Sequence, residues 1–364
     1  MTEPAQARLT VDLDALAHNH ALLRREAGGA EVAPVLKADG YGLGAGPLAR
    51  RLWSEGARSF FVARLSEGEA LRAALTGDRP ATIYVLDGLT DGAAGRLAAA
   101  SLTPVLCTLL QVGAANMLAL RHGRPLSVGL NLDTGMNRQG LTPEEVRALV
   151  QSGDRLTGLD ITLVMSHLGS ASEPENPRNA NQLAIFRDLR ALFPQARASL
   201  AASAGVFLGP DYRFEMVRPG VSLFGGGPME TPDDRLQAVA TLAAPILAIR
   251  HLRPGDILGY GMETRIDAPT RVGIVAAGYA DGVLRAAKTG GYAWLDGARR
   301  PLLIVNMDLL AIALGDAQTA VGDLVELVGP HALLDDLATA AGTVAHEILV
   351  RISARAQRLY RCDG

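Results

Sequence analysis

Lysine is nearly missing from this chain. Among 364 residues only Lys37 and Lys288 are lysines, whereas 33 residues are arginines. Arginine supplies a positive charge as well as lysine does, but its guanidinium group stays protonated and cannot attack a carbonyl carbon, whereas a primary amine can. Each remaining lysine is therefore either a candidate for amine chemistry or a surface residue that escaped the preference for arginine.

Cysteine, net positive charge and long apolar stretches are also scarce. Cys107 and Cys362 are the only cysteines and lie far apart, which argues against a disulfide framework or a metal cluster. The formal net charge is −3 and no basic run alternates with aromatic residues, so a nucleic-acid groove is not expected. No apolar stretch reaches the roughly 20 residues of a spanning helix, and the first residues do not resemble a secretion signal. We expect a soluble cytoplasmic protein that binds no metal, membrane or nucleic acid.

The composition that is present suits a large buried core. Hydrophobic residues make up 48% of the chain, and its length fits one large domain plus a smaller one. Between about residues 31 and 224, strand-like runs alternate with stretches of helical period. The predicted strands cover residues 60–62, 83–86, 104–106, 128–130 and 163–165, and the predicted helices cover residues 45–55, 67–75, 143–151 and 181–192. This alternation predicts an α/β fold whose parallel sheet closes into a (β/α)8 barrel of the TIM type. An open doubly wound sheet is the alternative, although no GxGxxG motif supports it.

The pattern changes after about residue 237. Strand-like pieces at residues 271–275, 301–305 and 324–328 are separated by turn residues. We therefore expect a barrel domain over residues 1–237 and a mostly β domain over residues 238–364. A strand-like piece near the N-terminus precedes a helical pattern, so the first strand is a candidate member of the second domain.

Lys37 occupies a position typical of an active-site group. It ends the apolar run 32–36 and precedes a glycine-rich turn, and active sites of parallel α/β folds lie at such strand ends. Residues 35–44, VLKADGYGLG, resemble the cofactor-lysine motif of the alanine racemase family, which is usually written KANAYGHG. The resemblance implies that Lys37 holds pyridoxal 5′-phosphate as an aldimine and that Tyr41 hydrogen-bonds the cofactor phosphate.

Further motifs of this family follow in the same order along the chain. Residues 133–140, DTGMNRQG, are similar to the segment whose arginine, here Arg138, meets the cofactor's phenolic oxygen and the substrate carboxylate. The resemblance also implies that His167 faces the pyridine ring and that Arg218 lies opposite the pyridine nitrogen. A phosphate cradle is implied at Ser203 and at the backbone amides of Gly220 and Val221. Without the resemblance, an isolated histidine or serine is more often structural.

The second domain carries the remaining motifs. Residues 258–261, LGYG, resemble the loop with the second catalytic base, here Tyr260. Racemisation needs a proton removed from one face of the substrate and delivered to the other, which makes Lys37 and Tyr260 the implied pair of bases. In the family this tyrosine comes from the partner subunit, so a head-to-tail homodimer with shared active sites is implied. The resemblance places substrate contacts at Met307 and Asp308, and the substrate entrance at Tyr279 and Arg285.

Two positions depart from the family pattern. Many members have a carbamylated lysine where this chain has Asn131, whose neutral amide can still accept a hydrogen bond from Arg138. Some members have a tyrosine near the phosphate and substrate pocket where this chain has Ala354. We expect no carbamate here and a different support for the arginine.

The resemblance runs from about residue 8 to residue 355. It predicts an alanine racemase that interconverts L-alanine and D-alanine by a two-base mechanism and supplies D-alanine for peptidoglycan. A racemase of wider range and a related decarboxylase remain alternatives, although no cysteine is placed as those decarboxylases require. A non-catalytic pyridoxal phosphate carrier is a third alternative, but such carriers resemble only the barrel half.

Overall fold

The structure is a computed structural model that describes residues 6–261, 264–352 and 354–362. The chain divides into two compact units. The parallel-sheet unit comprises His20–Gly40 and Gly44–Leu223. The antiparallel-sheet unit comprises the residues up to Asn19, the short piece Tyr41–Leu43 and the residues from Phe224 onward. The chain therefore leaves the parallel-sheet unit for three residues soon after Lys37.

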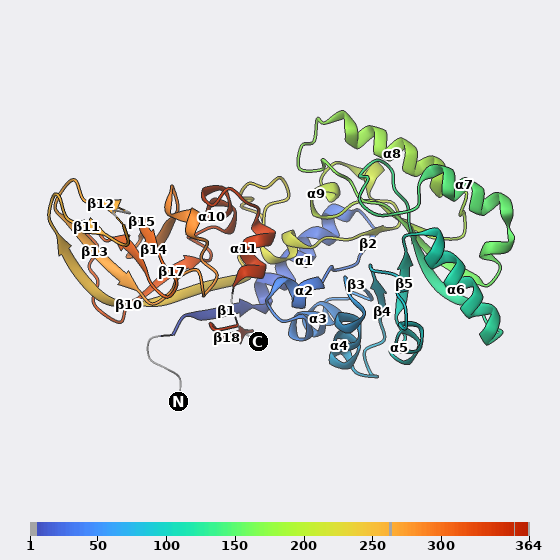
Figure 1. The fold of residues 1–364 in the computed structure, drawn as a ribbon, viewed down its shortest axis with the longest axis horizontal. Coiled ribbons are helices and arrows are strands. Elements are labelled where there is room, and N and C mark those ends of the chain that lie inside the picture. Colours follow the sequence, from blue (N-terminus) through green and yellow to red (C-terminus); the bar gives the residue numbers. More distant parts are fainter. Residues whose placement is uncertain (1–5, 262–263, 353, 363–364) are drawn as a thin grey trace. The chain divides into compact units, whose positions relative to one another are not determined.

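Short parallel strands form the centre of the first unit (Figure 1). They are β2 (Glu31–Val32), β3 (Ser59–Val62), β4 (Thr82–Val85), β5 (Thr103–Leu106), β6 (Leu126–Asn131), β7 (Leu159–Met165), β8 (Arg197–Ser199) and β9 (Met216–Val217). Strands β3 to β8 form one parallel sheet in sequential order, and β2 pairs in parallel with β9. Isolated parallel bridges join Val35 to Phe61 and Ala202 to Arg218. These pairings give a curled parallel sheet.

Helices follow the strands and lie along the outside of the parallel sheet (Figure 1). They are α3 (Ala45–Ser54), α4 (Leu65–Leu75), α5 (Ala94–Ala99), α6 (Leu109–His122), α7 (Pro143–Ser152), α8 (Pro177–Arg190) and the short α9 (Ser203–Val206). Capping residues and glycine determine where these helices begin and end. Thr142 and Glu145 form a capping box at the start of α7, and Gly123 ends α6 in a left-handed conformation.

Apolar side chains that point inward from the strands form the core of this unit. Val35, Phe61, Val105 and Leu163 belong to one buried cluster. The rings of Phe61 and Tyr84 stack with their centroids 4.7 Å apart. This packed interior fixes the strand ends, which carry the site residues described below.

The second unit is built on a mostly antiparallel sheet. Its strands are β1 (Arg8–Asp12), β10 (Ala240–Leu252), β13 (Thr270–Val275), β14 (Tyr292–Leu295), β15 (Ala298–Val305), β16 (Leu310–Ala313), β17 (Leu324–Val328) and β18 (Gln357–Arg361). The long strand β10 pairs with β1, β13 and β17. A small separate sheet contains β11 (Ile257–Leu258) and β12 (Thr264–Arg265), and helices α10 (Leu334–Ala340) and α11 (Ala345–Arg351) precede β18. Helix α1 (Leu13–Ala27) follows β1 and runs into the parallel-sheet unit.

The strands and helices predicted from the sequence are confirmed, with boundaries shifted by a few residues. Helix α8 begins four residues before its predicted start, at Pro177, because Pro177 favours the first turn and Asn176 caps it. The first strand pairs with β10, as the sequence allowed. The boundary between residues 237 and 238 remains a prediction. Within the residues that the structure describes, no helix is both long and apolar enough to cross a membrane.

Candidate active site

Lys37 begins a left-handed turn at the end of a buried strand segment. The amide of Leu36 donates to the carbonyl of Phe61 at 2.8 Å, which fixes the chain just before the lysine. Directly after it, Ala38, Asp39 and Gly40 have φ values of 53°, 54° and 64°. A left-handed conformation costs roughly 1–2 kcal/mol for each residue other than glycine. The turn therefore persists only because its surroundings hold it.

Hydrogen bonds on both sides stabilise this turn. The amide of Gly40 donates to the carbonyl of Leu36 at 2.9 Å, and the amide of Gly44 donates to the carbonyl of Asp39 at 2.8 Å. The Asp39 carboxylate accepts from the amide of Ala45 at 2.8 Å. A side chain at Gly40 would place its Cβ 2.5 Å from Cδ1 of Leu48, so glycine is required there for space as well as for its φ.

The amine of Lys37 is accessible to solvent and is partly desolvated by the surrounding protein. The residue is solvent-exposed, yet the surrounding protein lowers its pKa below the ordinary lysine value, chiefly by desolvation and then by the charge of Arg138. The carboxylate of Glu67 acts in the opposite direction and raises this pKa. A lowered pKa increases the fraction of uncharged amine, which is the form that attacks carbonyl carbons and accepts protons.

Arg218 is a buried cation with neutral partners. Its side chain is 4% exposed, and it donates to the Ser199 hydroxyl and to the Ser166 carbonyl, both at 2.5 Å. Its guanidinium carbon lies 5.8 Å from the ring centroid of Phe61. Burial lowers the pKa of Arg218 to about 9, so the group is still charged near neutral pH. A buried charge held by neutral groups favours an electron-rich atom beside it.

A serine pair organises the backbone near residue 220. The Ser203 hydroxyl accepts from the amides of Gly220 and Ser222 at 3.0 and 3.3 Å. The hydroxyl of Ser222 is buried and has no hydrogen-bond partner among the described residues. Leaving a buried hydroxyl unpaired is costly, and a ligand oxygen would satisfy it. The family resemblance implied Ser203, Gly220 and Val221 but not Ser222, because an isolated serine gives no signal in a sequence.

A buried amide connects the segments around Thr134 and His167. The Gln182 amide nitrogen donates to the His167 carbonyl at 2.9 Å and to the Thr134 hydroxyl at 3.2 Å. The Thr134 hydroxyl also shares a 2.8 Å hydrogen bond with Ser166. Gln182 is 1% exposed and fixes these segments from α8. Gln182 was not predicted as a site residue, although a glutamine on the apolar face of a helix is a signal that a sequence can give.

The loop that contains Arg138 is held by the carboxylate of Asp133, which lies in the same loop, and by Asn131. The Asp133 carboxylate accepts three backbone N–H groups, at residues 135, 136 and 137. The Asn131 amide donates to the carbonyl of Gln139 at 3.1 Å. The amide nitrogen therefore supports the backbone of this loop, while the amide oxygen keeps its capacity to accept from Arg138, which stays a prediction.

Tyr41 lies in the other unit, although it is only four residues from Lys37. It is 4% exposed, and its ring contacts those of Phe224 and His346 at centroid distances of 5.0 and 5.9 Å. Burial raises the pKa of Tyr41 well above its usual value. The hydroxyl therefore stays protonated near neutral pH and can act as a hydrogen-bond donor.

The candidates that follow residue 224 in the antiparallel-sheet unit are exposed. Tyr260 follows β11 and is 78% exposed, and Met307 is 54% exposed. Tyr279 and Arg285 are also exposed. The backbone of Tyr279 is held in place, because its amide donates to the carbonyl of Asn306 at 2.9 Å.

An arginine that the sequence analysis did not name as a site residue fixes this region. Arg355 donates to Asp308 at 2.6 Å and to both oxygens of Asp281 at 2.6 and 2.8 Å. Asp281 is buried and also accepts from the amide of Gly278 at 2.8 Å. Asp308 is therefore engaged by Arg355 within its own unit. Ala354, where some family members have tyrosine, is exposed beside this arginine.

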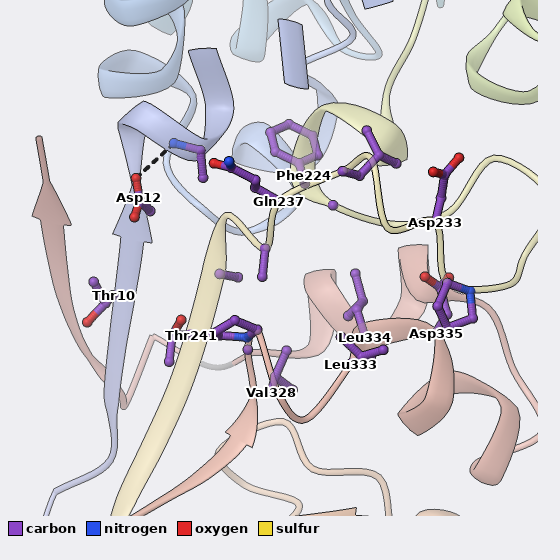
Figure 2. Close-up of a pocket in the computed structure, with 18 of the residues that line it drawn as sticks. Thr10, Asp12, Phe224, Asp233, Gln237, Thr241, Val328, Leu333, Leu334 and Asp335 are labelled. Carbon is purple, nitrogen blue, oxygen red and sulfur yellow. Dashed lines mark hydrogen bonds between the residues drawn. The ribbon is translucent and has the colours of Figure 1, made fainter. Parts of the chain in front are cut away.

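A cavity of about 560 Å³ lies within the antiparallel-sheet unit (Figure 2). Asp335 lines it, is 3% exposed and accepts a hydrogen bond from the amide of Gly227 at 2.9 Å. Asp12 also lines it and forms an ion pair with Arg361 at 2.7 Å. None of the site residues predicted from the sequence lines this cavity.

Comparison with known proteins covers nearly the whole chain. Residues 11–228 match the N-terminal domain of alanine racemase, and residues 239–360 match its C-terminal domain. A catabolic alanine racemase from Agrobacterium fabrum is 39% identical over 364 residues, covering 99% of this chain and 93% of the relative. One from Mesorhizobium japonicum is 41% identical over 360 residues, covering 98% and 93%.

The fold agrees with solved structures of the same kind. An alanine racemase from Bartonella henselae, whose crystal structure contains covalently bound pyridoxal phosphate, superposes with a TM-score of 0.92 at 31% identity. That match covers 98% of this chain and 100% of the other. An alanine racemase from Streptomyces coelicolor superposes with a TM-score of 0.89 at 33% identity, covering 98% of each chain. On the two domain matches, the sequence identities and these superpositions, the chain belongs to the alanine racemase family.

Proposed function

We propose that this protein is an alanine racemase that uses pyridoxal 5′-phosphate, holds it covalently through Lys37 and interconverts L-alanine and D-alanine. The observation that carries the proposal is the state of Lys37, which is the only lysine in the parallel-sheet unit and is both exposed and desolvated. When bound, pyridoxal phosphate supplies an electron-withdrawing ring that stabilises negative charge at the α-carbon of an amino acid.

The residues of the parallel-sheet unit suit this cofactor. The unpaired buried hydroxyl of Ser222 and the backbone ordered by Ser203 are suited to phosphate oxygens. We assign the phosphate to this region, with Gly220 in the backbone beside it and with the amide of Val221 and the protonated hydroxyl of Tyr41 as further donors. We place Arg218 opposite the ring nitrogen, where its fixed charge and neutral partners favour an unprotonated nitrogen. His167 is assigned to the ring face.

Two bases would transfer the α-proton of the substrate. Lys37 has a lowered pKa and so exchanges a proton more readily near neutral pH than an ordinary lysine does. Tyr260 is assigned to the opposite face of the substrate, since one group on each side allows removal from one face and delivery to the other. Its 78% exposure is what a residue donated to a second copy of the chain would show. We therefore propose a homodimer with shared active sites.

The substrate is assigned to charged and polar groups from both units. Arg138 is the proposed partner of the substrate carboxylate, since a guanidinium group matches two carboxylate oxygens. Met307 and Asp308 are proposed to contact the substrate from the antiparallel-sheet unit, and Tyr279 and Arg285 to form its entrance. The amine of Lys37 and the guanidinium of Arg138 are close enough to affect each other electrostatically.

The broader setting follows from the same assignment. We propose that the parallel strands close into a (β/α)8 barrel, which the pairing of β2 with β9 and the two isolated bridges support. We also propose a barrel domain over residues 1–237 and a β domain over residues 238–364. The protein would act in the cytoplasm and supply D-alanine for peptidoglycan.

Assay of the purified chain with single amino-acid enantiomers tests this function. Incubation with L-alanine or D-alanine should give the same racemic mixture. Of serine, lysine and arginine assayed beside it, lysine and arginine should be racemised far more slowly, because a small closed pocket rejects long side chains. Borohydride treatment of the cofactor-loaded protein followed by mass spectrometry should place the cofactor on Lys37 and not on Lys288. Retention of the starting enantiomer, or cofactor on Lys288, would contradict the proposal.

A further inference from the structure

The carboxylate of Glu67 connects two neighbouring segments through their backbone. One oxygen accepts from the amide of Ala38 at 2.8 Å. The other accepts from the amides of Ala63 and Arg64 at 2.8 and 3.0 Å. Glu67 lies in the first turn of α4, just beyond the end of β3, whereas Ala38 directly follows Lys37. A single side chain therefore holds both the start of a helix and the residue next to the amine.

The hydrogen bond from Ala38 to Glu67 lies in a segment whose backbone conformation is unfavourable. Residues 38–41 all have positive φ, and three of them, Ala38, Asp39 and Tyr41, are not glycine. Residues in such conformations persist only where the surroundings hold them. The Leu36 amide anchors the chain before Lys37 by donating to Phe61, and the hydrogen bond from Ala38 to Glu67 anchors it after Lys37. The backbone of Lys37 is thus fixed on both sides.

Glu67 also affects the amine through its charge. Arg138 disfavours the charged form of Lys37, and the Glu67 carboxylate favours it. Glu67 is partly buried, so its charge is less screened than that of a fully exposed carboxylate. The same group therefore influences both the position and the protonation of Lys37.

We propose that Glu67 is a positioning residue for Lys37. Its carboxylate accepts a hydrogen bond from the amide of Ala38 and so holds the left-handed turn that follows Lys37. This inference rests on the proposed function for its meaning in catalysis, but the contact itself is independent of that function. Glu67 would not touch the substrate. Its effect would pass through the backbone of residues 37–41 and through its charge.

The test compares three variants of the full chain. Glu67→Ala removes the contact, and Glu67→Gln keeps one acceptor oxygen but removes the charge. Glu145→Ala is the matched control, because Glu145 holds the start of α7 in the same way, by accepting the amide of Thr142 at 2.9 Å. Each alanine variant thus loses a comparable helix cap, but only Glu67→Ala loses a bond to the Lys37 turn.

Two measurements do not depend on catalysis. Hydrogen–deuterium exchange of peptides covering residues 37–41 reports on the amide of Ala38. Labelling of the cofactor-free chain with a dilute amine reagent across a pH range reports on Lys37, and Lys288 provides the internal reference for reagent activity. In Glu67→Ala we expect faster exchange at the turn and a midpoint of Lys37 labelling at lower pH. The sign follows because removing a nearby negative charge makes the protonated amine less favourable.

Turnover completes the test. We expect Glu67→Ala to lower kcat by about tenfold or more, as loss of a charge-assisted hydrogen bond at an active-site backbone would. Glu67→Gln should shift the labelling midpoint in the same direction with a smaller loss of kcat. Glu145→Ala should keep the exchange of residues 37–41 and the labelling of Lys37 unchanged.

Two results would overturn the inference. The first is unchanged exchange and unchanged Lys37 labelling in Glu67→Ala. The second is an equal change in Glu145→Ala, which would assign the effect to general loss of stability. If the parent chain does not racemise alanine while the exchange and labelling results are as expected, the proposed function fails but the positioning contact stands.

Discussion

Two pairs of candidate site residues, one from each unit, differ sharply in how far the fold buries them. In the parallel-sheet unit Arg218 and Ser203 are 4% and 8% exposed, and both are hydrogen-bonded to neighbouring groups. In the antiparallel-sheet unit Tyr260 and Met307 are 78% and 54% exposed. The first set is organised in advance by the fold of one chain. The second set is presented to solvent, so its proposed role depends on what it meets there.

This difference fits a division of roles between residues that bind the cofactor and residues that transfer protons. Groups that must orient a charged cofactor are most effective when they are fixed before it arrives, because little reorganisation is then needed. A proton-transferring residue supplied by a second chain needs to reach outward from its own. The comparison therefore predicts that substitutions at the buried Arg218 and Ser203 affect cofactor binding, whereas substitutions at the exposed Tyr260 and Met307 affect turnover alone.

The largest effect is expected for Lys37→Ala. This change removes the amine that would both hold the cofactor and transfer the proton, so turnover should fall by at least about 10⁴-fold. Racemisation can be followed by the optical rotation of alanine, and covalent cofactor by mass spectrometry after borohydride treatment. Lys288→Ala is the matched control and should keep both properties. An active Lys37→Ala variant would refute the assignment of the amine.

A smaller and more selective effect is expected for Tyr260→Phe. Losing one of two proton-transferring groups should lower turnover by about 10²- to 10⁴-fold. Cofactor binding, measured by its absorbance after gel filtration, should be retained because the groups assigned to the cofactor do not include the hydroxyl of Tyr260. Tyr292→Phe removes a hydroxyl elsewhere in the same unit, one that donates to Asp336 at 2.7 Å, and should leave turnover within about twofold. Equal activity of the two variants would contradict the role of Tyr260 in proton transfer.

The smallest effect concerns the turn after Lys37. Gly40→Ala places a Cβ against Leu48 at positive φ, whereas Gly123→Ala has a nearly equal φ of 61° and nothing within 4 Å of the added atom. We expect thermal unfolding to show a loss of about 2–3 kcal/mol for Gly40→Ala and about 1 kcal/mol for Gly123→Ala. Only the first should also slow racemisation. Equal stability losses would mean that Leu48 moves aside without cost.

The sequence predicted the elements of the fold well but not the contacts that fix the site. Strand and helix positions follow from local periodicity, which is why residues 60–62 or 163–165 could be placed. The contacts of Glu67, Gln182 and Ser222 join residues far apart in the chain. The bond from Ala38 to Glu67 spans 29 positions, and no local pattern encodes it. The roles assigned to the site residues came from the family resemblance and remain predictions.

Backbone conformation was also hidden from sequence reasoning. A glycine-rich stretch suggested a turn, but nothing in alanine or aspartate indicates the positive φ found at Ala38 and Asp39. At Asn131 the residue type allowed both donation and acceptance, and only the structure shows that it donates to the backbone of Gln139. Such choices depend on tertiary contacts that form after the local elements.

Mixing two inactive variants tests the central claim most directly. If each active site combines Lys37 of one chain with Tyr260 of another, a dimer of one Lys37→Ala chain and one Tyr260→Phe chain contains one intact site. After subunit exchange between equal amounts of the two proteins, about a quarter of the parental activity should return, because half of the dimers are mixed and each has one working site. Tagged chains would show by native mass spectrometry that mixed dimers have formed. If mixed dimers form and no activity returns, the shared site is contradicted.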